Sequence, residues 1–323
     1  MSTNMNKNKS ACSTNATGAG QRKTGMQVMK ELKEQHRESG SGLGRAHLNN
    51  RIALGVLWGA TIITIGLLAV ILIYVAYHGL GVVLQDFPRF IFTWPEGVNA
   101  EGGIWPTIVA TLYSTGLAMA ISTPIAVLAA VYLAEYAKQG RIVKTIRFAA
   151  DSLASVPSIV MGLFGLAFFV ETLNIPLSML AASLGLSLLM LPITMRATEE
   201  AIRAVPRYIR WGSYGMGATK WQTVSRVVLP TATPRIITGL ILSLARAIGE
   251  TAVVFLTMGI AINLPIIPTD SGRSMSVHLY LMAVEGINLP SAYGTAFLLL
   301  LIILVLNLSA RYISKRYSRI DNA

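Results

Sequence analysis

The chain alternates between long apolar runs and shorter polar segments, and the long runs lack the one-sided polarity of a soluble helix. An apolar helix of about twenty residues can cross the roughly 30 Å hydrocarbon layer of a membrane. Each long run is therefore predicted to be a transmembrane helix, which makes the protein all-α. The six runs cover residues 52–77, 105–133, 149–170, 177–198, 236–263 and 291–312.

The composition supports a membrane protein, because only 13% of the 323 residues are charged and 53% are hydrophobic. A formal net charge of +12 would also suit a nucleic-acid-binding protein, so the location of the charge decides between the two classes. Of the 27 Lys and Arg residues, 24 lie in the terminal segments or in the loops on the same side as the termini. Positive loops stay in the cytoplasm. The pattern therefore predicts a multi-pass membrane protein with cytoplasmic termini and no nucleic-acid partner.

The apolar runs divide the chain into segments with different expected roles. Residues 1–50 form a polar tail, which is expected to be largely disordered apart from a short helix around Met26–His36. Two loops on the outer side, 78–104 and 264–290, are long enough to receive a partner protein. The predicted segments are a cytoplasmic tail at 1–50, a first transmembrane helix with its outer loop at 51–104, a transmembrane domain at 105–312 and a cytoplasmic tail at 313–323.

A long cytoplasmic segment at 199–234 carries the most specific local pattern in the chain. Pro206 is suited to open a helix, and Gly217 is suited to close it in the left-handed conformation. Thr219 and Gln222 have the spacing of a capping box, which predicts that a second helix starts at once. The two helices are therefore expected to meet at a sharp glycine corner.

Pro230 and Pro234 are expected to end the second helix, because proline lacks the backbone N–H that a helix interior needs. The resulting pair of short helices would present a small surface outside the membrane. That surface either receives a partner or is a connecting loop that lies on lipid headgroups, and the pattern alone leaves both interpretations open.

Residues 217–230, G-A-T-K-W-Q-T-V-S-R-V-V-L-P, resemble the cytoplasmic signature loop of bacterial ABC importer permeases. That signature has a glycine, nine residues, an aliphatic residue, any residue and Leu-Pro. Trp211, Gly212 and Ser213 depart from it, since they stand where Glu-Ala-Ala is usual. The resemblance implies the type I importer (MetI-like) fold and a corner that docks in an ATP-binding subunit. The implied coupling residues are Gly217, Ala218, Thr219, Lys220, Leu229 and Pro230.

The sequence holds no G-x-x-x-x-G-K-[ST] string to bind nucleotide phosphates. Gly217 and Lys220 imitate part of it, but Trp221 follows the lysine where Ser or Thr would hold Mg²⁺. We therefore expect ATP and Mg²⁺ to bind a separate subunit, with no cofactor and no catalysis in this chain. The four histidines show no metal-ligand spacing, so no metal site is expected either.

Three further strings resemble the permease pair of phosphate ABC importers: 102–113 (G-G-I-W-P-T-I-V-A-T-L-Y), 156–165 (V-P-S-I-V-M-G-L-F-G) and 245–252 (A-R-A-I-G-E-T-A). The first and last look more like the PstA-type member than the PstC-type. The resemblance implies a heterodimer with the second permease, two copies of an ATP-binding subunit and an extracytoplasmic phosphate-binding protein. A permease for sulfate or molybdate stays open as an alternative, as do a secondary transporter and a membrane scaffold.

Arg246 and Glu250 are the charged residues placed well inside a predicted span, where charge is costly unless it faces a partner or a water-filled path. With Ser243 they would share one helix face at about mid-bilayer depth. The guanidinium of Arg246 can donate two parallel hydrogen bonds to an oxyanion. We therefore predict a phosphate path here, with release aided by Glu250, and the alternative is a permanent Arg246–Glu250 ion pair that locks the bundle.

Ser155 and Ser158 follow Ser152 at three-residue spacing at the start of the third run, so their hydroxyls are candidates to line the same path. Small residues are also common where transmembrane helices pack closely, and Gly162 and Gly165 favour that second interpretation.

Overall fold

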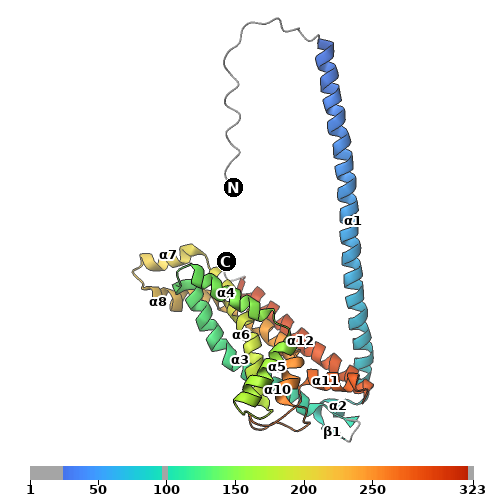
Figure 1. Ribbon diagram of the computed structural model, residues 1–323, viewed down its shortest axis with the longest axis vertical. Helices are drawn as coiled ribbons and strands as arrows, with labels where there is room; N and C mark the ends of the chain where they lie inside the picture. The colour runs from blue at the N-terminus through green and yellow to red at the C-terminus, as the bar shows by residue number, and fades with distance from the viewer. Residues whose placement is uncertain (1–24, 97–100, 319–323) are drawn as a thin grey trace. The chain divides into compact units, whose positions relative to one another are not determined.

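The computed structural model describes residues 25–96 and 101–318, and most of these residues are helical (Figure 1). Two-residue strands β1 and β2 pair antiparallel and form the sheet of the described chain. The helices, with π-helical segments written η, are α1 (Gly25–Gln85), α2 (Arg89–Phe92), α3 (Trp105–Val131), η1 (Tyr132–Tyr136), α4 (Arg141–Ala154), α5 (Ser158–Gly165), η2 (Leu166–Thr172), α6 (Met179–Arg203), α7 (Arg207–Gly215), α8 (Lys220–Thr223), η3 (Val224–Val228), α9 (Leu229–Ile248), α10 (Ala252–Met258), α11 (Met275–Val284) and α12 (Leu289–Ser318); the strands are β1 (Pro95–Glu96) and β2 (Glu101–Gly102).

The chain forms two units, Met1–Val70 and Ile71–Ala323. In the first unit, α1 begins at Gly25, so residues 25–50 are helical well beyond the short helix expected around Met26–His36. The expectation of a largely disordered tail is therefore wrong for 25–50. For residues 1–24 it concerns a part of the chain outside the described residues.

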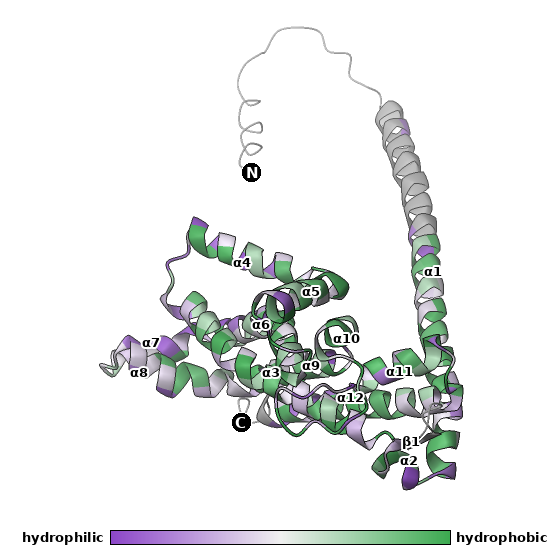
Figure 2. Cartoon of the chain, turned by 60° about the horizontal axis from the view of Figure 1, so that its bottom comes forward, coloured by the Kyte–Doolittle hydropathy of each residue, from purple (hydrophilic) through white to green (hydrophobic). Residues whose placement is uncertain are grey.

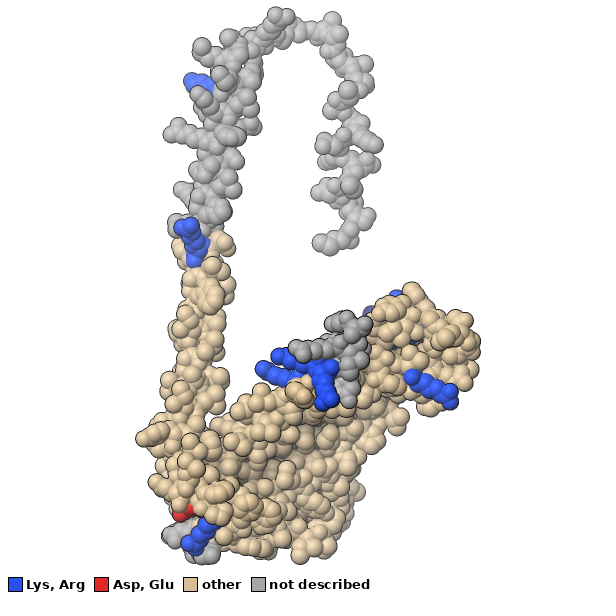
Figure 3. Space-filling model, turned by 180° about the vertical axis from the view of Figure 1, so that it is seen from behind, with Lys and Arg blue, Asp and Glu red and all other residues tan. Residues whose placement is uncertain are grey.

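Within the described residues, five helices are long and apolar enough to cross a membrane, and a bent helix pair makes a sixth span when counted as one. Their apolar character appears as green ribbon in Figure 2. On the face of the Ile71–Ala323 unit shown in Figure 3, most of the blue Lys and Arg surface lies toward one end, one blue and one red patch lie at the opposite end, and the band between them is uncharged. The predicted all-helical membrane architecture is confirmed. The five helices cover Asn50–Gln85, Trp105–Tyr136, Met179–Arg203, Lys220–Ile248 and Leu289–Arg316.

The predicted span at 149–170 is bent, because the chain turns by 96° between α4 and the α5–η2 segment. Pro157 stands at the turn with extended backbone (φ −56°, ψ 137°), so the helix of α4 cannot continue through it. Proline also removes a backbone donor and restricts the residue before it. The turn leaves Ser155 at the end of α4 and starts α5 at Ser158.

The predicted span at 236–263 is wrong as a continuous helix. α9 ends at Ile248, α10 covers only Ala252–Met258, and Gly259 then takes the left-handed conformation (φ +89°) and begins a loop. Carbonyl groups of that loop accept hydrogen bonds from the first N–H groups of α6, with Met179 N donating to Asp270 O and Leu180 N to Pro268 O, each at 2.8 Å. A helix N-terminus needs such acceptors, so the irregular backbone has a structural use.

Close packing around α10 depends on glycine. A Cβ atom on Gly162 of α5 would lie 2.9 Å from the carbonyl oxygen of Ala252, and one on Gly185 of α6 would lie 2.8 Å from Val253 Cγ1. Neither space admits a methyl group without movement. The expectation that Gly162 allows close helix packing is confirmed, and α10 sits in the principal apolar core with Val253, Val254 and Met258 buried.

Pro230 and Pro234 do not end the second helix of the corner, contrary to the expectation. α8, η3 and α9 follow one another without a break from Lys220 to Ile248. Pro230 falls in the first turn of α9, directly after the π-helical turn at Val224–Val228. That turn has already shifted the hydrogen-bond ladder by one residue, so the helix passes the first proline.

Candidate functional site

The predicted glycine corner is present in the structure. Gly217 has φ +84° and joins α7 to α8. The capping box is complete, since Thr219 N donates to Gln222 Oε1 at 2.8 Å and Gln222 N donates to Thr219 Oγ1 at 3.4 Å. These bonds satisfy donors that a helix start leaves free. Local sequence therefore fixes both the turn and the start of the helix that follows it.

A buried contact closes the corner. The Oγ atom of Ser213 in α7 lies 2.9 Å from Thr223 Oγ1 in α8, and both residues are buried. Ser213 belongs to the Trp211–Gly212–Ser213 triplet that departs from the usual Glu-Ala-Ala. At this position the chain thus uses a neutral hydroxyl pair to hold its two corner helices together.

The outer surface of the corner is apolar and uncovered in the isolated chain. Trp211 is 67% exposed, Met216 84% and Trp221 66%. Large apolar side chains gathered at one place on a surface mark an interaction site. Of the other predicted coupling residues, Lys220 is exposed and its Nζ lies 4.9 Å from the centre of the Tyr136 ring. Ala218 is half-buried, Leu229 packs against an apolar core cluster and Pro230 is exposed in the first turn of α9.

Arg210 ties the corner to two spans. Its Nη2 atom donates to Glu135 Oε1 at 2.7 Å and to the carbonyl oxygen of Ile202 at 2.8 Å. Its Nη1 atom donates to the carbonyl oxygen of Val205 at 2.6 Å. The side chains of Arg210 and Glu135 are only 16% and 9% exposed. One guanidinium therefore joins α7 to the ends of α3 and α6.

A second buried carboxylate lies nearby. Glu199 Oε1 accepts from Arg147 Nε at 2.8 Å and pairs with Arg203 Nη2 at 2.9 Å, and its side chain is 3% exposed. Arg196 and Asp151 form a further pair, which is much more exposed. Arg147 comes from α4, so the ion pairs connect α4 and α6 at the end of the bundle that carries the corner. Sequence reasoning missed the pairs of Arg147 with Glu199 and of Arg196 with Asp151, because their partners are 52 and 45 residues apart in the chain.

The predicted polar stripe of Ser243, Arg246 and Glu250 does not form. Ser243 is buried, and its Oγ accepts a hydrogen bond from Thr194 Oγ1 at 3.1 Å. Arg246 lies in the last turn of α9 and is exposed, while Glu250 is half-buried in the break after the helix. No ion pair joins Arg246 to Glu250 in the structure as described, so the locking pair is not seen.

The break at 249–251 is held by its own backbone. Glu250 N donates to Ala247 O at 3.1 Å, and Glu250 O accepts from Ser276 Oγ of α11 at 2.7 Å.

Gly162 packs on Ala252 and Gly165 on Thr257, so α5 and α10 run in the same direction. This register places the start of α5, at Ser158, level with the break. Ser155 is exposed at the preceding turn and donates to Ser152 O at 2.7 Å.

Short helix α11 brings a buried polar group that sequence reasoning did not assign. His278 is fully buried, and its Nδ1 atom lies 3.5 Å from Arg273 Nη1. Burial, helped by the charge of Arg273, lowers the pKa of His278 to about 4. The imidazole is therefore neutral near pH 7. Among residues 25–96 and 101–318, no group of three or more His, Cys, Asp or Glu could hold a metal ion.

The N-terminus of α11 is already occupied by protein groups. Met275 N donates to Thr111 Oγ1 of α3 at 2.8 Å, and Val277 N donates to Ser274 Oγ at 3.3 Å. Those two N–H groups are thus not available to a ligand. The only sequence signal for this helix was the apolar stretch inside the outer loop at 264–290.

Membrane-length helices, an intramembrane break and an apolar helix–glycine–helix corner at one end together define a permease subunit of a transporter. The family model described as “Binding-protein-dependent transport system inner membrane component” matches residues 122–319. The chain therefore belongs to that family of ABC transporter permeases, and it is a multi-pass inner-membrane protein.

Curated relatives cover most of the chain. “Phosphate transport system permease protein PstA 1” of Mycobacterium tuberculosis (strain ATCC 25618 / H37Rv) is 36% identical over 225 residues, which are 68% of this chain and 73% of that protein. “Phosphate transport system permease protein PstA” of Yersinia pestis is 33% identical and covers 82% of this chain and 89% of that protein.

Solved structures share the fold. A bacterial alginate ABC transporter in complex with its pentasaccharide-bound periplasmic protein matches with a TM-score of 0.56 at 17% identity, over 80% of this chain and 94% of the matched chain. The MetNI methionine ABC transporter matches with a TM-score of 0.52 at 22% identity, over 67% of this chain and 94% of the matched chain. At such identities the likeness establishes the type I importer permease fold alone.

Proposed function

We propose that this chain forms half of the membrane channel of an ATP-driven importer of inorganic phosphate, as the PstA-type permease. The observation that carries the proposal is the 36% identity, over 225 residues, to a relative named as a phosphate transport permease. That similarity extends over two-thirds of the chain, well beyond one motif. The second permease would be a similar chain, and the pair would enclose the path between them.

The glycine corner is the proposed contact with the ATP-binding subunit, which would be present in two copies and would hold ATP and Mg²⁺. Three observations support this role: the signature sequence, the uncovered apolar side chains of Trp211, Met216 and Trp221, and the ion pairs that fasten the corner to the spans. A docked subunit would bury the apolar surface. Movement at Gly217 would then reach α3 and α6 through Arg210.

Arg246 is the proposed anion-binding group in the path. Its side chain is exposed in the single chain and has no carboxylate partner in the described structure, so it is available to an oxyanion. Ser158 and Ser155 are supporting donors beside the break. Glu250 would repel an anion that lingers and so favour release. The contribution of Ser243 is indirect, because its hydroxyl already accepts from Thr194.

The loops at 78–104 and 264–290 are proposed to face outward and to receive an extracytoplasmic phosphate-binding protein. Asp270 stabilises the second loop, since its Oδ2 accepts from the backbone N–H groups of Ile266 and Ile267. These hydrogen bonds also lower the pKa of Asp270. The positive loops, and with them both termini, would lie in the cytoplasm.

The test is ATP-dependent phosphate uptake into proteoliposomes that hold this chain with the second permease, the ATPase and the binding protein. Arg246→Gln is expected to abolish most uptake while the complex still assembles. Arg235→Gln is the matched control, because Arg235 is an exposed arginine of the same helix α9 that lies outside the break. Uptake by this control is expected to stay near that of the wild type.

The outcomes test the role of Arg246 and the identity of the substrate separately. Unchanged phosphate uptake by Arg246→Gln would show that Arg246 does not bind the transported anion. If the wild type transports no phosphate but sulfate or molybdate stimulates ATP hydrolysis by the assembled complex, the substrate assignment is wrong and the permease assignment stands.

A further inference from the structure

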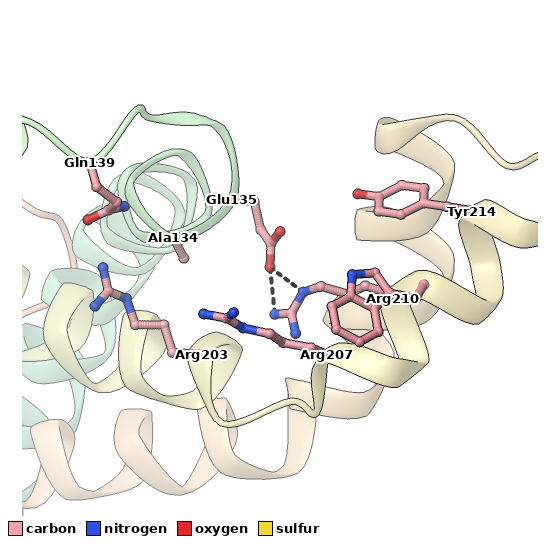
Figure 4. Close-up of a pocket in the computed structure, with 8 residues that line it drawn as sticks. Ala134, Glu135, Gln139, Arg203, Arg207, Arg210 and Tyr214 are labelled. Carbon is pink, nitrogen blue, oxygen red and sulfur yellow. Dashed lines mark hydrogen bonds and ion pairs between the residues drawn. The ribbon is translucent and has the colours of Figure 1, made fainter.

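A cavity of about 580 Å³ lies behind the corner, between α7 and the ends of α3 and α6. Its lining is rich in arginine and aromatic side chains (Figure 4). Trp211 also belongs to the apolar surface of the corner, whereas the other lining residues take no part in that surface or in the proposed transport path. The lining residues are Ala134, Glu135, Gln139, Arg203, Arg207, Arg210, Trp211 and Tyr214.

The charge in the cavity is unbalanced, because three arginines face one lining carboxylate. Arg210 is neutralised by Glu135. Arg203 shares the carboxylate of Glu199, which lies outside the lining, with Arg147. Arg207 has no hydrogen-bond or ion-pair partner in the described chain, and Figure 4 shows it extending toward the side of the cavity where Arg203 lies. Arg207 therefore leaves one guanidinium of the lining without a carboxylate, and an uncompensated positive charge attracts an anion.

We propose that this cavity binds a phosphate group, held between Arg203 and Arg207. A guanidinium donates two parallel hydrogen bonds to phosphate oxygens, so the pair can bind a phosphate monoester, diester or free ion. The Tyr214 side chain also points into the cavity in Figure 4, where its hydroxyl is a further donor. The phosphate group has two possible sources, an anionic lipid headgroup and inorganic phosphate.

The position of the cavity suits a lipid headgroup. It lies where the candidate spans Trp105–Tyr136 and Met179–Arg203 end, the level at which headgroups meet protein. Trp211 and Tyr214 in its wall are of the residue types that favour this level. Basic pockets at the ends of transmembrane helices are known sites for anionic headgroups. A bound phosphate would bridge the end of α6 to α7 and so stiffen the link between corner and spans.

The experiment measures binding to the purified complex of this chain with the second permease and the ATPase, in lipid nanodiscs. One arm contains zwitterionic lipid with added phosphatidylglycerol, and native mass spectrometry counts the phosphatidylglycerol retained. The other arm contains zwitterionic lipid only and is titrated with inorganic phosphate by calorimetry. The double variant Arg203→Gln/Arg207→Gln is compared with Arg311→Gln, an exposed arginine of α12 outside the cavity.

We expect the double variant to bind the probe at least about tenfold more weakly in one of the two arms, which corresponds to the loss of one or more charge-assisted hydrogen bonds. Arg311→Gln should bind as the wild type does. The arm that changes identifies the source, lipid or free ion. Arg203→Lys/Arg207→Lys keeps the charge and should retain much of the binding, which separates a lost site from a misfolded chain.

Equal binding by the wild type and the double variant in both arms would overturn the proposal. Loss of the ATPase from the double variant with binding unchanged would also overturn it, since the cavity would then receive an acidic segment of that subunit. The inference rests on the proposed function in one respect only, which is that the tested complex contains the second permease and the ATPase. Failure of phosphate uptake in the transport assay would leave the lipid arm unaffected, so the two failures are distinguishable.

Discussion

The glycine corner and the broken helix at the α9–α10 junction are both irregular, yet they are built from contacts of very different range. Ser213 and Thr223, which close the corner, are ten residues apart, and the capping box spans three. At the broken helix, Ser276 reaches back 26 residues to Glu250, and Met275 bonds to Thr111 across 164 residues. The corner is thus a local structure, and the break is a tertiary one.

This difference explains where sequence reasoning succeeded. Capping boxes and left-handed glycines act within one turn, so residues 206–223 specify their own geometry. The run 236–263 looks like a continuous helix because it is apolar over the length of a span apart from Arg246 and Glu250. The break appears only when α5, α6 and α11 supply alternative partners for α10 and its flanks.

The largest expected effect concerns the buried ion-pair cluster at the end of the bundle that carries the corner. Glu199→Gln removes the buried charge that Arg147 and Arg203 share, and leaves Arg147 only 16% exposed without its carboxylate. Losing one partner of a buried pair costs about 3–5 kcal/mol. Thermal unfolding of the purified complex in micelles should therefore shift strongly downward.

Asp151→Asn is the matched control, because Asp151 and Arg196 are 48% and 37% exposed. Exposed pairs contribute only about 0–1 kcal/mol. If Glu199→Gln and Asp151→Asn shift the unfolding temperature equally, burial of the Glu199 cluster adds nothing to the stability of the complex.

His278 gives the next effect, which depends on pH. Its pKa is lowered from 6.5 to about 4 in the folded protein. Between these two pH values the imidazole is protonated in the unfolded state and neutral in the folded state. Stability is expected to fall as pH drops from 6.5 toward 4, by about 3 kcal/mol at the lower limit.

The charged group near His278 is Arg273, which disfavours a second positive charge. The measurement is the difference in unfolding midpoint between the wild type and His278→Gln across this pH range, which cancels the titration of carboxylates. A difference that does not change with pH would contradict the burial of a neutral imidazole.

Gly162→Val tests whether tertiary packing sets the break. The added side chain would collide with the backbone of α10, where the Ala252 carbonyl oxygen lies 2.9 Å from the Cβ position. Overpacking of this kind costs about 1–3 kcal/mol. Gly116→Val in α3 is the control, since nothing lies within 4 Å of its Cβ position. Proteolysis of the complex should report a loosened α5–α10 contact for Gly162→Val alone.

Gly217→Val has the smallest expected effect on stability. A β-branched residue at φ +84° is strained by about 1–2 kcal/mol, and the space around Gly217 is otherwise open. The loss should appear mainly as ATP hydrolysis uncoupled from uptake. Gly212→Ala within α7, which also has open space, should leave coupling intact or slightly strengthen the helix. Normal coupling in Gly217→Val would mean that the corner tolerates another geometry.

The sequence alone determined that this is a multi-spanning helical membrane protein and how residues 206–223 turn. It also singled out Arg246 and Gly217. These features follow from hydrophobicity, charge and hydrogen bonds between near neighbours, which act without the rest of the fold.

Only the tertiary structure decided that the run 236–263 is broken and that Ser243 is buried against Thr194 while Arg246 is exposed. It also decided that Glu199 pairs with Arg147 of α4 and Glu135 with Arg210 of α7. Pro157 is a local signal for the turn in 149–170, whereas no proline marks the end of α9 in 236–263. The stop is set by which carbonyl and N–H groups find partners on helices that are distant in the sequence.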